Sequence, residues 1–92
     1  MAAAGGMVTT LYNGVHMPLV GFGCAGHIRR GELLYALQAG YTLFDTAQAR
    51  AWYLEEEVGE AILVSGVNRS ELFLISKVER IRTRRSALCI LK

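Results

Sequence analysis

Three glycines and an aspartate are spaced in a way that suits the binding of a dinucleotide. Gly21, Gly23 and Gly26 form a GxGxxG pattern between an apolar run and a helical pattern, and Asp45 ends the next apolar run. In a dinucleotide-binding βαβ unit, such glycines bring the backbone close to the pyrophosphate and the helix N-terminus binds its charge. The acidic residue about 20 positions further on binds the ribose hydroxyl. One interpretation of the chain is therefore a Rossmann-type dinucleotide-binding segment.

Asp45 and Lys77 carry opposite charges, and each comes at the C-terminal end of a predicted strand. These strands are YTLFDTA, residues 41–47, and LFLISKV, residues 72–78. Neighbouring strands lie about 4.8 Å apart, so side chains at the same sheet edge can come within ion-pair reach. The strand positions therefore allow the two side chains to come close together.

The elements that must hold these residues alternate along the chain. Two short strands are expected around Asn13-Gly14, because Asn-Gly between β-type runs favours a hairpin with a type I′ turn. After the hairpin we expect a strand over residues 18–23, a helix over 28–39, the strand over 41–47, a helix over 54–65 and the strand over 72–78. A glycine follows each helix and provides a stop. This order indicates parallel βαβ units.

Each predicted helix carries an apolar stripe that would face the core. The stripe residues are Ile28, Leu33, Leu34 and Leu37 in the first helix, and Leu54, Val58, Ala61, Ile62 and Ser65 in the second. The second helix opens with Glu55, Glu56 and Glu57, where the helix dipole favours negative charge.

The chain is short for a self-sufficient domain. It has 92 residues, of which 52% are hydrophobic, and its mean hydropathy is +0.28. A domain of this size buries a smaller share of its surface than a larger one does. Either another part covers this apolar surface, or the chain is a piece of something larger.

Charge and cysteine usage exclude several classes of protein. The formal net charge of +2 is too small to indicate a nucleic-acid or membrane partner. Cys24 and Cys89 are far apart and form no CxxC motif, so we expect free thiols and no metal site. The N-terminus lacks the pattern of a signal peptide, and no apolar run is long enough for a membrane span. A cytoplasmic protein is expected.

Four motifs in order resemble the N-terminal segment of aldo-keto reductases, from about Tyr12 to Val78. NGVHMPLVGFG resembles the hairpin and first barrel strand of that family, and AGYTLFDTAQA resembles its second-strand signature. EEEVGEAI and SGVNRSELFLISKV resemble its second helix, the following link and the third strand with its terminal lysine.

The resemblance implies an α/β fold in the form of an incomplete (β/α)8 TIM barrel. Residues 7–78 would supply the N-terminal hairpin, the first three parallel strands and two helices, whereas a full barrel needs roughly 250 residues. Residues 1–6 are expected to be a disordered start, and residues 79–92 an atypical basic and apolar tail. Family members use NADPH to reduce small carbonyl compounds, with a tyrosine as the proton donor.

The resemblance also assigns catalytic roles. The family's lysine favours the phenolate form of the tyrosine, and its aspartate holds the lysine; these positions correspond to Lys77 and Asp45. The tyrosine is expected five residues after the aspartate, where this chain has Arg50. Counted back from Gly59, Tyr53 lies one residue from the family position, so Tyr53 is the predicted acid and a small insertion precedes it. If Arg50 fills the site instead, no acid remains.

The expected cofactor contacts come from the turn after the first barrel strand. Gly21, Gly23 and Cys24 occupy this turn, with Cys24 where threonine is usual in the family, and Asp45 lies nearby. The family's catalytic histidine has no counterpart here, because no histidine follows His27.

Two alternatives remain at this stage. The chain could be a non-catalytic fragment or splice product of such a reductase, and its three strands would leave an open sheet edge that favours self-association. The Rossmann-type interpretation explains neither the preceding hairpin nor the TAQA sequence after Asp45.

Overall fold

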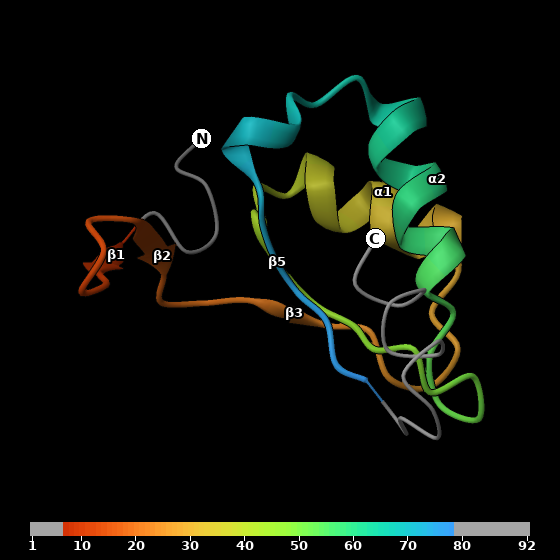
Figure 1. Cartoon of the computed structure of the whole chain (residues 1–92). Coiled ribbons are helices and arrows are strands. Elements are labelled where there is room, and N and C mark those ends of the chain that lie inside the picture. The colour runs from red at the N-terminus through yellow and green to blue at the C-terminus, as the bar shows by residue number, and fades with distance from the viewer. Residues whose placement is uncertain (1–6, 79–92) are drawn as a thin grey trace.

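The computed structural model describes residues 7–78, which form a small α/β unit with two separate sheets (Figure 1). The sequence-based expectations for residues 1–6 and 79–92 lie outside the described residues. The elements, in chain order, are β1 (Val8–Thr10), β2 (His16–Pro18), β3 (Phe22–Gly23), α1 (Arg30–Gln38), β4 (Leu43–Asp45), α2 (Glu55–Ser65), the 3-10 helix η1 (Arg69–Glu71) and β5 (Phe73–Ile75).

The predicted hairpin is present, but its turn differs from the predicted type I′ turn. β1 and β2 pair antiparallel, with Thr9 opposite Met17. The backbone N–H of Leu11 donates to the Val15 carbonyl at 2.8 Å, so the loop has three residues. Within it Gly14 has φ +85°, whereas Asn13 has no positive φ. A type I turn followed by a glycine in the left-handed region closes such three-residue loops, so one positive φ suffices.

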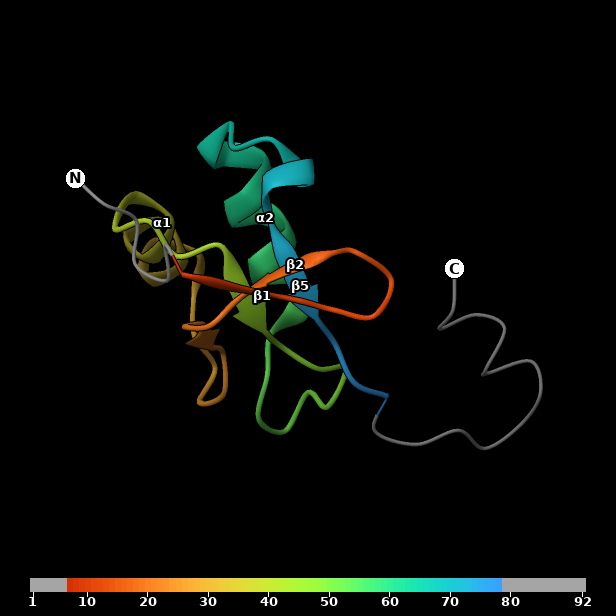
Figure 2. The ribbon, with the colours of Figure 1, turned by 90° about the vertical axis from the view of Figure 1, so that its left-hand side faces the viewer.

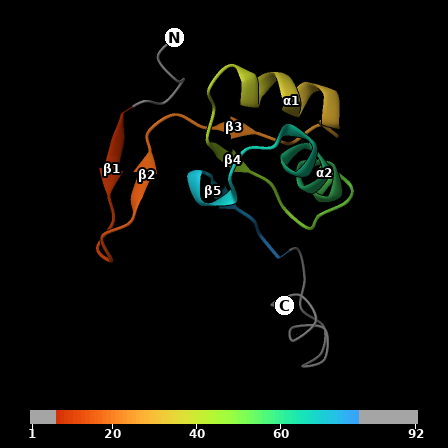
Figure 3. The ribbon, with the colours of Figure 1, turned by 90° about the horizontal axis from the view of Figure 1, so that it is seen from above.

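The three-stranded sheet is parallel, as predicted, and its strands lie in the order β3-β4-β5 (Figure 3). The strands are shorter than expected, at two or three residues each. Backbone bonds nevertheless continue past their ends, because the Thr46 N–H donates to the Ile75 carbonyl at 2.8 Å and the Gln48 N–H to the Lys77 carbonyl at 2.9 Å. The β4–β5 register is therefore held as far as Lys77.

Both helices lie on the same side of the parallel sheet, away from the hairpin, which is nearest the viewer in Figure 2. The core forms between the helices and the sheet, from the buried residues Cys24, Leu33, Ala36, Phe44, Val58, Ala61 and Leu72. The central strand supplies Phe44, which is 1% exposed. The helix stripes were predicted in part: Leu33, Val58 and Ala61 are buried, and Ala36 joins them. No helix among residues 7–78 is both long and apolar enough to cross a membrane.

Each helix ends at the predicted glycine. Gly40 has φ +99° and Gly66 has φ +75°, the left-handed conformation that a glycine adopts without steric cost. These two stops allow the chain to turn back towards β4 and η1, so that the next strand runs parallel to the last.

Leu43 lies against Gly21 on the sheet face opposite the helices. It alternates with Phe44 along β4, so the two side chains point to opposite faces. A Cβ added at Gly21 would come within 2.6 Å of Leu43 Cδ2 and 2.7 Å of its Cγ. Gly21 thus leaves room for the leucine of the neighbouring strand.

Gly21→Ala should destabilise the chain by about 1–3 kcal/mol, because it overpacks this contact. Leu43→Ala made in the same chain should recover part of that loss. Gly23→Ala is the matched control, since a Cβ there meets nothing within 4 Å. Urea unfolding of the unaltered chain and the three variants measures the free energies. Equal effects of the two single glycine substitutions would contradict this account of Gly21.

Candidate active site

The predicted aspartate–lysine pair is present at the C-terminal ends of the parallel strands. Asp45 ends β4 and lies in register with Gly23 of β3 and Ile75 of β5. Lys77 follows β5 by two residues, and its Nζ is 2.5 Å from Asp45 Oδ1. Both side chains are about half exposed, at 48% and 47%. The pair is thus formed by two strands that are far apart in sequence and held together by the β4–β5 register.

Tyr53 joins this pair from the loop before α2. Its hydroxyl lies 3.5 Å from Lys77 Nζ, and the ammonium is 5.0 Å from the centre of the tyrosine ring. The Tyr53 N–H donates to the Ala49 carbonyl at 2.9 Å, which folds the loop so that the ring comes back towards β5. Arg50, the other candidate, instead forms an ion pair with Glu56 at 2.8 Å. Of the two positions, only Tyr53 is brought to the lysine.

The surroundings of Lys77 favour its charged form. The hydrogen bond to Asp45 raises the pKa of the lysine above its usual value, and the hydrogen bond to Tyr53 adds to this effect. Partial loss of solvation acts in the opposite direction and is outweighed. An ammonium group therefore lies beside a phenol hydroxyl at neutral pH, an arrangement that stabilises a phenolate.

The last residue of β3 and the residue after it differ in exposure: Gly23 leaves backbone exposed beside the candidate site, whereas the Cys24 side chain is buried in the core. Gly23 is exposed, with open space where a side chain would be, directly beside Asp45 in the sheet. Cys24 is 2% exposed and its thiol donates a weak hydrogen bond to the Phe22 carbonyl at 3.8 Å. Burial raises the pKa of the Cys24 thiol to about 11, with a further contribution from the Asp45 charge. The cysteine side chain is thus a core residue, and its N–H donates to the Asp45 carbonyl at 2.9 Å.

Cys24 should react slowly with thiolate-specific reagents. A pKa raised from 9.0 to about 11 lowers the thiolate fraction about 100-fold at neutral pH, and burial slows access further. Iodoacetamide labelling followed by peptide mass spectrometry, in native buffer and in urea, measures the two rates at Cys24. A native rate equal to that in urea would contradict the core position of this thiol.

Hydrogen bonds join the loop after β3 to the loop between β4 and α2, a contact that the sequence did not indicate. The Trp52 carbonyl accepts hydrogen bonds from the N–H groups of Gly26, at 2.8 Å, and His27, at 3.1 Å. His27 Nε2 donates to the Arg50 carbonyl at 3.0 Å. His27 has φ +56°, the only positive φ of a non-glycine residue among residues 7–78, which costs about 1 kcal/mol or more. These bonds fix the loop that carries Tyr53.

The glycine pattern and the start of α1 do not form a phosphate site. Gly26 has φ +89° and serves the turn that meets Trp52. α1 begins four positions later, at Arg30, and carboxylates of the chain itself already occupy its N-terminus. The Arg29 N–H donates to Glu32 Oε1 and the Arg30 N–H donates to Glu57 Oε1, both at 3.2 Å. A pyrophosphate would compete with two anionic groups there.

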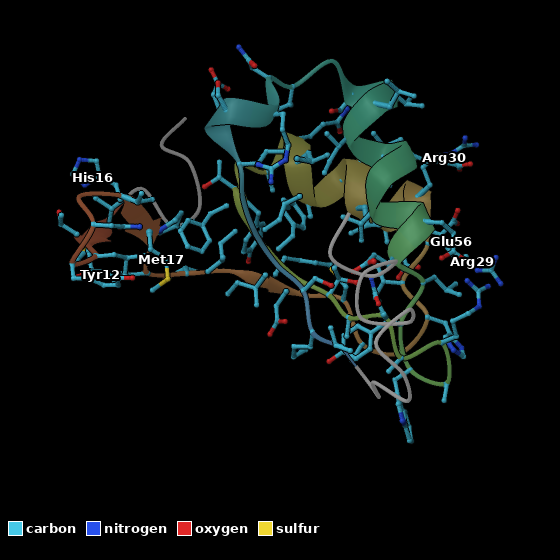
Figure 4. All side chains as sticks on the ribbon, viewed as in Figure 1. Tyr12, His16, Met17, Arg29, Arg30 and Glu56 are labelled. Carbon is cyan, nitrogen blue, oxygen red and sulfur yellow. The ribbon has the colours of Figure 1, made fainter. Side chains whose placement is uncertain are left out.

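The three glutamates that open α2 have three different partners. Glu55 accepts from the Ser76 hydroxyl, Glu56 pairs with Arg50, and Glu57 caps α1. The Glu56 side chain lies near Arg29 at one end of the helix pair (Figure 4). A hydrogen bond from its own backbone N–H lowers the pKa of Glu56, and Arg50 adds to the effect. The first turn of α2 thereby joins the segments that follow β3, β4 and β5.

A cavity of about 220 Å³ lies beside Tyr53, lined by Ala47, Gln48, Arg50, Tyr53, Glu55 and Glu56. Its lining is mixed, polar and charged. Within residues 7–78, no three histidine, cysteine, aspartate or glutamate side chains gather in a way that could hold a metal ion.

A family model for the aldo/keto reductases matches residues 29–90. The chain belongs to the aldo/keto reductase family. The resemblance inferred from the motifs is thus confirmed, and family membership replaces the Rossmann-type interpretation. No solved structure matches the chain.

The curated relatives that this chain matches are longer proteins. The chain is 43% identical over 76 residues to the NADPH-dependent D-xylose reductase of Candida boidinii, covering 75% of this chain and 23% of the relative. It is 41% identical over 75 residues to the NADH-dependent D-xylose reductase of Candida parapsilosis, covering 74% and 22%. It is 41% identical over 83 residues to an aldo-keto reductase of Mycolicibacterium vanbaalenii, covering 85% and 29%. The chain spans about a quarter of the length of these relatives.

Proposed function

We propose that this chain is the N-terminal part of a (β/α)8-barrel reductase that converts small aldehydes or ketones to alcohols with NADPH. The observation that carries the proposal is the contact of Lys77 with both Asp45 and Tyr53 at the C-terminal ends of the strands. Barrels of this type have their active sites on that face. Family membership and the reductases among the relatives support the same reaction class.

Each of the three side chains has a distinct task in this reaction. Tyr53 donates the proton of its hydroxyl to the carbonyl oxygen of the substrate, which becomes the alcohol oxygen. Lys77 stabilises the phenolate left on Tyr53, because its ammonium lies 3.5 Å from the phenol oxygen. Asp45 holds the ammonium in place and keeps it charged. NADPH, when bound, supplies the hydride that adds to the carbonyl carbon.

The backbone after β3 fits the approach of a flat ring system. Gly23 has nothing within 4 Å of the place where a side chain would start, and it lies beside Asp45 in the sheet. We propose that Gly23 and the backbone of Cys24, near Asp45, are the residues that would hold the nicotinamide. Gly21 has a packing role against Leu43, so we expect its contribution to the cofactor site to be indirect.

Tyr53→Phe tests the proposal in an assay of NADPH oxidation with a reactive aldehyde. General acid catalysis contributes about 10²- to 10⁴-fold, so turnover should fall by that factor. Tyr35→Phe is the matched control, because Tyr35 lies on the outer surface of α1 and is 76% exposed. Turnover that survives the loss of the Tyr53 hydroxyl would refute its role as the proton donor. No turnover by the unaltered chain would refute catalysis by this chain.

A second candidate function is that of a non-catalytic fragment that associates with itself. Among residues 7–78, β3 and β5 each pair with β4 alone, so the three-stranded sheet has two open edges. The sheet face opposite the helices carries half-exposed apolar side chains from Leu43, Phe73 and Ile75. Open edges and apolar faces of this kind favour association between copies.

Sedimentation velocity over a range of concentrations tests this second candidate. The unaltered chain should form concentration-dependent oligomers, and Phe73→Lys should shift it towards the monomer, because a charge then lies on the apolar face. Tyr35→Lys, on the outer surface of α1, supplies the control. A chain that stays monomeric at all concentrations would exclude self-association as its function.

A further inference from the structure

The contact between Glu55 and Ser76 joins the segment that carries Tyr53 to the segment that carries Lys77. Glu55 is the first residue of α2 and follows Tyr53 by two positions. Ser76 immediately precedes Lys77, beyond the end of β5. The Ser76 hydroxyl donates to Glu55 Oε2, across 21 residues of sequence.

The geometry of an extended chain explains why a bond at Ser76 bears on Lys77. Successive side chains of an extended segment point to opposite sides. Ser76 therefore reaches α2 while Lys77 reaches Asp45 on the other side of the same backbone. Because the two residues are adjacent, fixing the Ser76 side chain fixes the position from which the lysine side chain starts.

The remaining hydrogen bonds of Lys77 hold it to β4 and the residues after β4. They do not fix the distance between the Lys77 ammonium and the Tyr53 hydroxyl. Asp45 holds the ammonium, and the Gln48 N–H holds the Lys77 carbonyl; both belong to β4 or the residues just after it. The contact with the Tyr53 hydroxyl, at 3.5 Å, is at the limit of a hydrogen bond. Within residues 7–78, the Glu55–Ser76 bond is the only side-chain hydrogen bond between the first turn of α2 and the segment after β5.

We propose that Glu55 is a positioning residue, which acts through Ser76 to set the distance between the Lys77 ammonium and the Tyr53 hydroxyl. The inference rests on the proposed function, in which this distance determines how well the phenolate is stabilised. Shifts of about 1 Å in a reacting group can cost about 100-fold in rate. Glu56 and Glu57 have other partners, so the role belongs to Glu55 and is no general property of the acidic turn.

The test observes Lys77 directly and needs no turnover. The chain contains two lysines, Lys77 and Lys92. Uniform ¹³C and ¹⁵N labelling of the full chain leaves the N–H donors of both lysine ammonium groups unmodified and gives a separate Cε NMR signal for each lysine. Titration of the Lys77 signal reports its surroundings, in which the titratable groups are Asp45, Tyr53 and Cys24. Asp45→Asn, which removes the largest cause of the raised pKa of Lys77, is the positive control, and Lys92 is the internal reference.

Three variants separate the hydrogen bond from the charge of Glu55. Ser76→Ala removes the bond and leaves the carboxylate, and it should lower the pKa of Lys77 because the ammonium moves away from the phenol. Glu55→Ala should lower it likewise. Glu55→Gln removes the charge and keeps an acceptor for the serine, and it should leave the Lys77 titration as in the unaltered chain. Glu56→Gln, one residue along, should also have no effect.

Two outcomes would overturn the proposal. If Ser76→Ala leaves the Lys77 signal unchanged, the bond does not position the lysine. If Glu55→Gln has the same effect as Glu55→Ala, the glutamate acts through its charge. Urea unfolding of each variant confirms that the compared chains are folded. A chain without NADPH turnover that still shows the predicted titrations would refute the proposed catalysis and leave the positioning role intact.

Discussion

The ion pair between Asp45 and Lys77 is the interaction on which the arrangement of the candidate site depends. It is half exposed, and exposed pairs contribute little to stability, typically under about 1 kcal/mol. Its importance lies in the elements that it requires. The two residues meet only if β4 and β5 are parallel neighbours in the observed register, with Asp45 opposite Ile75 and the backbone bonds continued to Lys77. Tyr53 then has a fixed ammonium to approach.

The apolar core and the candidate site lie on opposite faces of the parallel sheet. Phe44 and the two helices form the apolar core on one face, whereas Asp45 and Lys77 lie at the end of the other. This division follows from the alternation of side chains along a strand. It also leaves Leu43, Phe73 and Ile75 half exposed within the described residues.

The first turn of α2 connects the loops around the site. Glutamates there are favoured by the helix dipole, yet each also reaches a different segment of the chain. Together with the Trp52 carbonyl, which receives two backbone N–H groups from the turn after β3, they hold the loop that carries Tyr53. The position of the tyrosine is therefore set by contacts between loops, whereas that of the aspartate and lysine is set by the sheet.

The sequence alone predicted the order of the elements and the charged residues at the strand ends. Local rules placed the hairpin, both helices with their glycine stops, and the parallel strands, because apolar periodicity and glycine conformation act over a few residues. They also placed Asp45 and Lys77 at one sheet edge. The predicted type I′ turn at Asn13 was wrong, because the length of the loop depends on which residues pair across the hairpin.

Only the tertiary structure shows that Tyr53 lies beside Lys77 and that Arg50 pairs with Glu56, because counting positions cannot show how a loop folds back. It likewise gave Gly21 its packing role and revealed the Glu55–Ser76 bond. Both contacts join residues that are 21 or 22 positions apart in sequence. The first exists because β3 and β4 pair in the observed register. The second exists because the first turn of α2 lies beside the segment after β5.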